Sequence, residues 1–312
     1  MSATMTLPRL TLMGHEIEAV ELLEDCTPLL GDREALREQF ATNGYVYLPG
    51  YLGRGRVIEA RRVFIDALRR RGTLHPDYDP MDGVVDPNAS DASKAPTFAG
   101  GRLETMFPDN YQPIHDVLYT GPMMAFFRTL FDADVLHYDF TWTRQVNPGP
   151  ATPLHSDVVY MGRGTHDLYT AWTPMGDNSF DVGGLILLEG SNNHTGLAKS
   201  YWQSDVDSFC SNKEDKRDAW AKTNGMAGGL RGTANQIRRS LGGKRWLTAD
   251  YRMGDVLIFN VYTVHGGTDN RSNRVRLSTD TRYQRADQPV DERWIGEKPP
   301  AHGPNAKRGL IC

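Results

Sequence analysis

The chain has 312 residues, of which 39% are hydrophobic and 24% charged, and its formal net charge is −4 at pH 7. These values are ordinary for a globular protein with an ample core, and they give no overall case for a nucleic-acid or membrane partner. The sequence holds neither a signal-peptide core nor an apolar run of membrane-spanning length. Cys26, Cys210 and Cys312 are too far apart to predict a zinc site or a disulfide framework. We therefore expect a cytoplasmic protein, and the sequence leaves a homo-oligomer open.

Residues 1–132 are expected to be mostly helical. Asp32 can cap the first helix, and Asn43-Gly44 can end it before a short strand at Tyr45–Leu48. Leu74–Gly101 is rich in Pro, Asp, Gly and Ser, which predicts a long loop. Apolar residues at helical spacing predict helices at Arg33–Thr42, Val57–Arg70 and Ile114–Phe131, the last broken at Gly121-Pro122.

From Val135 the pattern changes to short strand-like runs with turn signals between them. The runs are Val135–Val146, Tyr169–Pro174, Gly184–Leu188, Trp246–Tyr251, Val256–Val264 and Arg274–Arg282. Many short strands without intervening helical patterns favour an antiparallel barrel or a double-sheet jelly roll. We expect one domain over residues 1–312, mainly β with flanking helices, whose jelly-roll core spans residues 133–290.

A polar insertion at residues 198–247 interrupts these runs. It holds ten basic and five acidic residues, a net charge of +5 within a chain of −4. Gly228-Gly229 and Gly242-Gly243 can act as hinges, so the insertion can be a basic lid over the barrel mouth that favours an anionic substrate. A solvated helical face or an oligomer contact explains the same charge equally well.

A His-x-Asp pattern with metal-ligand spacing occurs three times in the chain. His75-Pro-Asp77 lies in the Pro/Asp-rich loop, and His137-Tyr-Asp139 lies within a strand, where a histidine at the barrel rim is the simpler interpretation. His155-Ser-Asp157 follows a Pro/Gly loop and precedes the strand that holds Trp172. Such a strand entry places ligands at the mouth of a barrel. Because residues i and i+2 of a strand share a face, His155 and Asp157 can bind one metal ion together.

His265 and Arg276 extend this candidate site. If the two runs around them form a hairpin that folds back near Asn270 and Arg271, His265 lies opposite Arg276 on one face. A guanidinium there can grip a carboxylate in bidentate fashion. Two histidines and one carboxylate (His155, Asp157 and His265) form the facial triad of non-haem Fe(II) oxygenases.

These motifs, in this order, resemble the phytanoyl-CoA dioxygenase family of Fe(II)- and 2-oxoglutarate-dependent oxygenases, which includes ectoine hydroxylases. The resemblance covers roughly residues 32–285, with residues 198–247 poorly matched. It implies a double-stranded β-helix core of the cupin-like kind. The motifs that carry it are Phe40–Leu52, His155-x-Asp157, Trp172 within Thr170–Pro174, Gly184–Ser191, Gly254-Asp255-Val256, His265 and Arg276.

The resemblance also implies a role for each site residue. His155, Asp157 and His265 bind Fe(II), and Arg276 binds the far carboxylate of the cosubstrate 2-oxoglutarate. Ser278, two residues on, assists Arg276, and Trp172 lies against the cosubstrate.

The chain departs from the family's pattern at two places. Gly267 stands where relatives often have serine, so that serine's hydrogen bond to the cosubstrate is not expected here. Asn192-Asn193 follow Gly190-Ser191 where histidine is usual, which concerns a structural turn. Thr143 and Gln145 share one face of the strand before the metal motif, where they can contact cosubstrate or substrate, or simply line the barrel.

The reaction that the resemblance implies consumes O2 and 2-oxoglutarate, forms succinate and carbon dioxide, and hydroxylates an unactivated C–H bond of a small molecule. Halogenating relatives lack the carboxylate ligand, so Asp157 favours oxygenation. Desaturation, cyclisation and epoxidation would use the same site. Two other classes remain as alternatives: a non-catalytic jelly-roll binding protein and an iron dioxygenase that does not use 2-oxoglutarate. Arg276 argues against both, because neither needs a buried cation beside a metal ligand.

Overall fold

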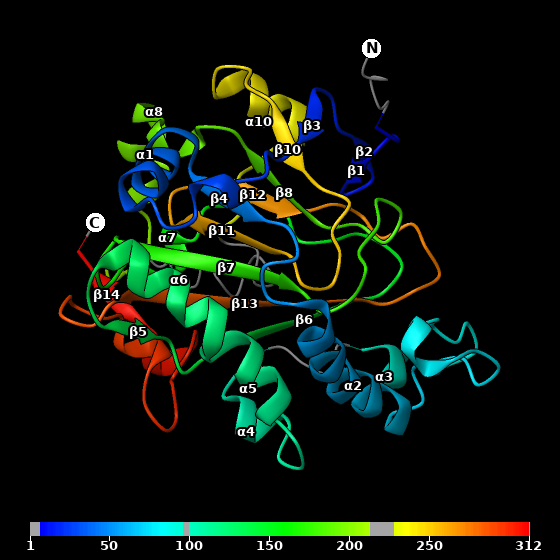
Figure 1. Cartoon of the computed structure of the whole chain (residues 1–312). Helices are drawn as coiled ribbons and strands as arrows, with labels where there is room; N and C mark the ends of the chain where they lie inside the picture. The colour runs from blue at the N-terminus through cyan, green and yellow to red at the C-terminus, as the bar shows by residue number, and fades with distance from the viewer. Residues whose placement is uncertain (1–6, 96–99, 213–227, 312) are drawn as a thin grey trace.

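The computed structural model describes residues 7–95, 100–212 and 228–311. Two β-sheets form a double-stranded β-helix of the cupin-like kind, and helices flank it (Figure 1). The larger sheet has the order β4 (Tyr45–Leu48), β11 (Val256–Asn260), β7 (Leu168–Pro174), β13 (Arg276–Arg285) and β5 (Val135–His137), and β6 (Trp142–Val146) also pairs with β13. The smaller sheet has the order β12 (His265–Gly267), β8 (Leu185–Leu188), β10 (Trp246–Thr248) and β3 (Val20–Leu22).

The predicted N-terminal helices are confirmed as α1 (Arg33–Asn43), α2 (Arg54–Arg70), α5 (Gln112–Tyr119) and α6 (Gly121–Phe131). The Asp32 side chain accepts a hydrogen bond from the Ala35 amide and so caps α1. Gly44 ends α1 in the left-handed region, with φ of 81°, which a residue without a Cβ adopts at little cost. The Asn192 amide donates to the carbonyls of Phe40 and Ala41, so this departure from the family's pattern fastens the end of α1.

Strand β13 separates the helical layer from the interior of the barrel. The Tyr283 ring stacks on Phe127 of α6 with ring centroids 4.1 Å apart, so the odd-numbered side chains of β13 face the helices. Because side chains alternate along a strand, the even-numbered ones face the opposite sheet. These interior residues are Arg276, Ser278, Asp280 and Arg282. The strand therefore supplies a row of polar side chains to the interior of the barrel.

The predicted hairpin around Asn270 is wrong. Strand β11 ends at Asn260, and β12 joins the smaller sheet, where His265 pairs with Leu187 of β8. Arg276 instead begins β13 in the larger sheet. His265 and Arg276 thus belong to facing sheets, and residues 268–275 carry the chain from one sheet to the other.

Two arginines of the insertion at residues 198–247 pair with acids at the edge of the smaller sheet. Arg239 pairs with Glu18, and Arg245 pairs with Glu21 on β3 and with Glu189 after β8. None of the described residues of the insertion lines the two cavities beside the triad. Arg239 and Arg245 therefore do not line the cavities beside the triad, and residues 213–227 of the expected lid lie outside the described residues.

Shorter elements connect the layers. They are β1 (Thr11–Leu12), β2 (His15–Glu16), η1 (Thr27–Leu29), η2 (Pro80–Asp82), α3 (Asp91–Lys94), α4 (Leu103–Met106), α7 (Val158–Met161), η3 (Ser191–Asn193), α8 (Thr195–Ala198), η4 (Tyr201–Gln203), β9 (Ser208–Cys210), α10 (Ala234–Ser240), η6 (Glu292–Trp294), η7 (Pro304–Ala306) and β14 (Arg308–Leu310). Cys26 is buried and free, whereas Cys210 is disulfide-bonded, which the sequence did not predict. Among the described helices, none is long and apolar enough to cross a membrane.

Candidate active site

His155, Asp157 and His265 converge between the two sheets, as predicted. His155 and His265 exchange two backbone hydrogen bonds of 2.9 Å, which brings their side chains together. Asp157 Oδ1 lies 3.6 Å from His155 Nε2 and 3.8 Å from His265 Nε2. One ligand atom from each residue lies within 4.8 Å of the others, close enough to share a metal ion.

The expectation that His155 and Asp157 share one face of a strand is only partly right. His155 lies in a β-bridge with His265, but Asp157 has helical backbone angles and stands at the start of α7. The chain turns from extended to helical between the two ligands. The carboxylate therefore reaches the imidazoles through the first turn of a helix, not along the face of a strand.

Both imidazoles are held with Nε2 toward the centre. His155 Nδ1 donates to the Pro153 carbonyl at 2.9 Å, and His265 Nδ1 donates to the Thr263 carbonyl at 3.0 Å. A carbonyl can only accept, so Nδ1 carries the hydrogen and Nε2 keeps its lone pair for a metal. Burial lowers the pKa of His155 to about 3 and also lowers the pKa of His265, so both rings are neutral near pH 7.

Asp157 is held by its other oxygen. Oδ2 accepts hydrogen bonds from Thr170 Oγ1 and from Arg282 Nη2, the latter at 3.0 Å. Burial alone would raise the pKa of Asp157, but the charge of Arg282 together with the neighbouring histidines holds it well below its usual range. The carboxylate is ionised, and Oδ1 is the oxygen that faces the two imidazoles.

Replacement of Thr170 by Val is expected to weaken divalent metal binding roughly tenfold, because outer partners of a metal ligand fix its orientation. The change keeps the shape of the side chain and removes only the hydroxyl that Asp157 accepts. Titration with Mn(II) measures the effect. Thr173→Val on the same strand is the matched control, because Thr173 Oγ1 is buried without a hydrogen-bond partner among the described residues. Equal metal affinity in both variants would remove Thr170 from the site.

Arg276 lies in a small cavity beside the triad. Its side chain is 4% exposed, and Nη1 donates to the Thr268 carbonyl at 2.8 Å. Its Nε is buried and has no hydrogen-bond partner among the described residues. Burial lowers the pKa of Arg276 to about 10, which leaves the guanidinium positive at neutral pH. Ser278, Trp172 and His265 line the same cavity, so the predicted cosubstrate residues and the predicted metal ligands adjoin.

Steric crowding explains why glycine occupies position 267. A Cβ at this position would lie 2.9 Å from Arg276 Nη2 and 2.9 Å from the Ala151 Cβ. The serine that relatives often carry therefore has no room beside this arginine.

Gly267→Ser is expected to displace the Arg276 guanidinium and to raise the KM for 2-oxoglutarate roughly tenfold, the cost of one charge-assisted hydrogen bond. Steady-state kinetics with varied 2-oxoglutarate measures it, with Mn(II) affinity as the control for an intact triad. A KM equal to that of the unmodified protein would show that Arg276 accommodates the added side chain.

Thr143 and Gln145 are on the wrong face for the predicted cosubstrate contact. In the antiparallel register, Val146 is opposite Arg276 and Arg144 is opposite Ser278, so the even-numbered residues of β6 share the interior face. Thr143 Oγ1 instead donates to Met106 Sδ in the helical layer. Strand β6 lines the two cavities with Trp142, Arg144 and Val146, so neither the contact nor the barrel-lining position expected for Thr143 and Gln145 fits this face.

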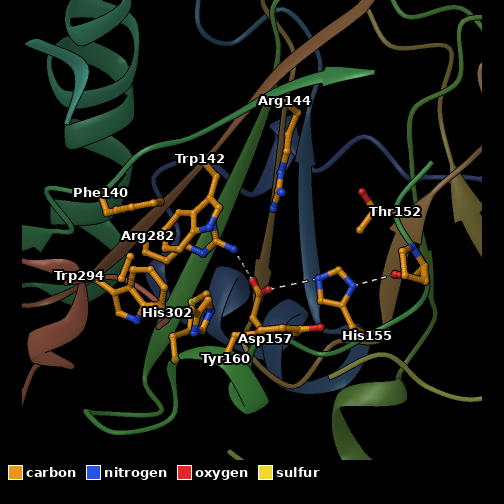
Figure 2. A pocket seen from close by; sticks show the side chains of 13 residues that line it. Phe140, Trp142, Arg144, Thr152, His155, Asp157, Tyr160, Arg282, Trp294 and His302 are labelled. Carbon is orange, nitrogen blue, oxygen red and sulfur yellow. Dashed lines mark hydrogen bonds and ion pairs between the residues drawn. The ribbon is translucent and has the colours of Figure 1, made fainter. Parts of the chain in front are cut away.

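A second cavity, of about 350 Å³, opens on the other side of Asp157. Aromatic side chains form much of its wall, and two arginines reach into it (Figure 2). These residues are Phe140, Trp142, Tyr160, Trp294 and His302, with Arg144 and Arg282. The sequence analysis missed them. Alternation along β13 from Arg276 would have found Arg282, whereas the segment around Trp294 and His302 carries no strand or helix pattern that points to the site.

Comparison with known proteins agrees with this geometry. Residues 40–278 match the phytanoyl-CoA dioxygenase family. The chain is 27% identical over 265 residues to the 1-deoxypentalenic acid 11-beta-hydroxylase of Streptomyces exfoliatus, with 84% of each chain covered. The enzyme of the same name from Streptomyces arenae is 25% identical over 283 residues, again with 84% of each covered.

Two solved structures share the fold. The non-heme alpha ketoglutarate dependent carbocyclase SnoK from nogalamycin biosynthesis superposes with a TM-score of 0.56 at 18% identity, covering 88% of this chain and 91% of its own. EctD from S. alaskensis, solved with 2-oxoglutarate and 5-hydroxyectoine, superposes with a TM-score of 0.54 at 12% identity, covering 97% and 95%.

Proposed function

The chain belongs to the phytanoyl-CoA dioxygenase family and is an Fe(II)- and 2-oxoglutarate-dependent oxygenase, and from that premise we propose the role of each residue in its site. His155, Asp157 and His265 hold Fe(II), and Arg276 with Ser278 holds the far carboxylate of 2-oxoglutarate. The aromatic cavity on the other side of Asp157 takes a small organic substrate, which is hydroxylated. One observation carries this assignment: both imidazoles of the triad and a buried, partly unpartnered guanidinium line the same interior cavity.

The donor set suits the metal. Two neutral imidazole nitrogens and one carboxylate oxygen are the ligands of non-haem Fe(II) oxygenases. When bound, iron and 2-oxoglutarate together activate O2 and oxidise the substrate. The chain's own contribution is positional. Carbonyls of Pro153 and Thr263 orient the imidazoles, and Thr170 with Arg282 fixes Asp157 through a single oxygen.

The surrounding side chains also determine what reaches the metal. Arg276 gives the cosubstrate one orientation, because its guanidinium is anchored on the Thr268 carbonyl. Trp172 packs edge-on against Tyr251, with ring centroids 4.6 Å apart, and so forms a rigid wall of the same cavity. On the substrate side, aromatic walls exclude water from the position where the C–H bond is oxidised.

The decisive assay incubates the protein with Fe(II), 2-oxoglutarate and O2, and follows succinate formation and oxygen uptake over hours. We expect slow succinate release with matching oxygen consumption even without substrate. Oxygen uptake without succinate would favour an iron dioxygenase that does not use 2-oxoglutarate. Neither signal, from a protein that binds metal, would favour a non-catalytic binding protein.

A further inference from the structure

We propose that the aromatic cavity beside Asp157 selects a substrate with one negative charge on an apolar, ring-bearing skeleton, and that Arg144 and Arg282 hold that charge. The inference deepens the proposed function and rests on it, because it assigns the substrate class of the same site. It replaces the earlier expectation that the insertion at residues 198–247 supplies the cations.

The charges that line the two cavities do not balance. Among the described lining residues, three arginines face two carboxylates, and these are Arg144, Arg276 and Arg282 against Asp157 and Asp280. Each histidine of the triad donates its Nδ1 hydrogen to a carbonyl and keeps the Nε2 lone pair for the metal, so neither ring adds a charge to this count. Iron(II) and the 2-oxoglutarate dianion cancel each other. One positive charge is therefore left among these lining groups, and a monoanionic substrate would neutralise it.

The guanidinium of Arg282 is only partly hydrogen-bonded within the described residues. Its side chain is buried, and Nη2 donates to Asp157. Nε and Nη1 are also buried, but neither has a hydrogen-bond partner among the described residues. The guanidinium carbon lies 4.2 Å from the centre of the Trp142 ring, which covers one face of the group. An acceptor-only group such as a carboxylate at the edge of the guanidinium would satisfy these nitrogens.

Arg144 stands at the boundary of the two cavities and lines both. Its Nε donates to Asp280 Oδ2 at 2.7 Å, and its side chain is 36% exposed. Figure 2 shows the guanidinium extending from β6 toward His155 and Asp157. Asp280 thus fixes the side chain through Nε, while the rest of the guanidinium reaches the space that a substrate would occupy.

The rest of the wall selects an apolar skeleton. The rings of Phe140, Trp142 and Trp294 form a mutual cluster, with centroid separations of 4.7 to 5.2 Å. A cavity of about 350 Å³ with such walls accommodates a molecule of two or three fused rings, not a coenzyme-sized one. Convergent arginines at one end of an aromatic wall fix the orientation of a charged ring system, and so the carbon that is presented to the metal.

The test uses two probes of equal shape, 1-naphthaleneacetic acid and its uncharged amide. Isothermal titration calorimetry measures the binding of each to the full-length protein loaded with Ni(II) and 2-oxoglutarate. We expect the acid to bind at least about tenfold more tightly than the amide, the usual size of a charge-assisted hydrogen bond. Arg144→Gln should bring the acid's affinity close to that of the amide and leave 2-oxoglutarate affinity unchanged. Arg144→Lys should restore part of the preference.

Arg239→Gln is the matched control, because Arg239 belongs to the insertion, is exposed and pairs with Glu18. It should keep the full preference for the acid. Equal binding of acid and amide to the unmodified protein, or binding of neither, would overturn the proposal. So would an Arg144→Gln variant that loses 2-oxoglutarate affinity, since Arg144 would then hold the cosubstrate, or one that keeps the acid preference. Failure of the proposed function is separate: the unmodified, Ni(II)-loaded protein would then not bind 2-oxoglutarate at all.

Discussion

Replacing His155 or His265 by Ala is expected to weaken Fe(II) and Mn(II) binding by more than about 100-fold, because loss of even an outer partner of a metal ligand costs ten- to a hundredfold. Each imidazole supplies one of the three ligand atoms that converge within 4.8 Å among the described residues. Succinate formation should fall to background in both variants. Metal affinity is measured by titration with Mn(II), so that loss of binding is separated from loss of turnover.

His137→Ala is the control for this pair, because His137 begins another His-x-Asp pattern. Its Nδ1 bonds to the Tyr138 carbonyl, and its ring stacks on Tyr119 with centroids 4.0 Å apart. These contacts are structural, so the variant should keep metal binding and lose some thermal stability. If His137→Ala abolished metal binding while His155→Ala retained turnover, the metal site would be assigned to the wrong motif.

Arg276→Lys is expected to raise the Kd and KM for 2-oxoglutarate by roughly ten- to a hundredfold, the cost of one well-placed charged hydrogen bond or slightly more. Lysine keeps the charge but lacks the planar fork, and it cannot hold the Thr268 carbonyl and a carboxylate in the same geometry. Metal affinity measured without cosubstrate should change little.

Arg274→Lys is the matched control for this variant, since Arg274 lies two residues earlier and is exposed. Its 2-oxoglutarate KM should equal that of the unmodified protein. An unchanged KM in Arg276→Lys would mean that the cosubstrate's far carboxylate binds elsewhere.

The sequence identified the triad and Arg276 because their residue types and order are specific, but it did not predict how they meet. Within the run Val256–Val264, Asn260 is a residue type that strands disfavour, and β11 ends there, whereas the prediction continued the strand through it. Gly266 and Gly267 suggested a turn, yet they lie in β12. Glycine is required there by close neighbours, since a Cβ at Gly266 would lie 3.0 Å from Leu154 Cδ2.

The interior face of β6 was not predictable from alternation. The residues of β6 contact the helical layer on one side and the site on the other, and both faces carry polar residues: Arg144 on the interior face, and Thr143 and Gln145 on the opposite face. A strand that is covered on both sides has no apolar-polar alternation to read. For the insertion, the net charge was counted correctly, but it did not show that Arg239 and Arg245 pair with acids outside the insertion, which are Glu18, Glu21 and Glu189.

We propose that the triad and Arg276 form one site, in which metal and 2-oxoglutarate bind together. Calorimetric titration of the unmodified protein with 2-oxoglutarate, under anaerobic conditions with Mn(II) or with EDTA, tests it directly. 2-Oxoglutarate should bind at least about tenfold more tightly with Mn(II), because the metal and Arg276 then contact the same cosubstrate molecule. His265→Ala should abolish this difference. Equal 2-oxoglutarate affinity with Mn(II) and with EDTA would contradict a shared site.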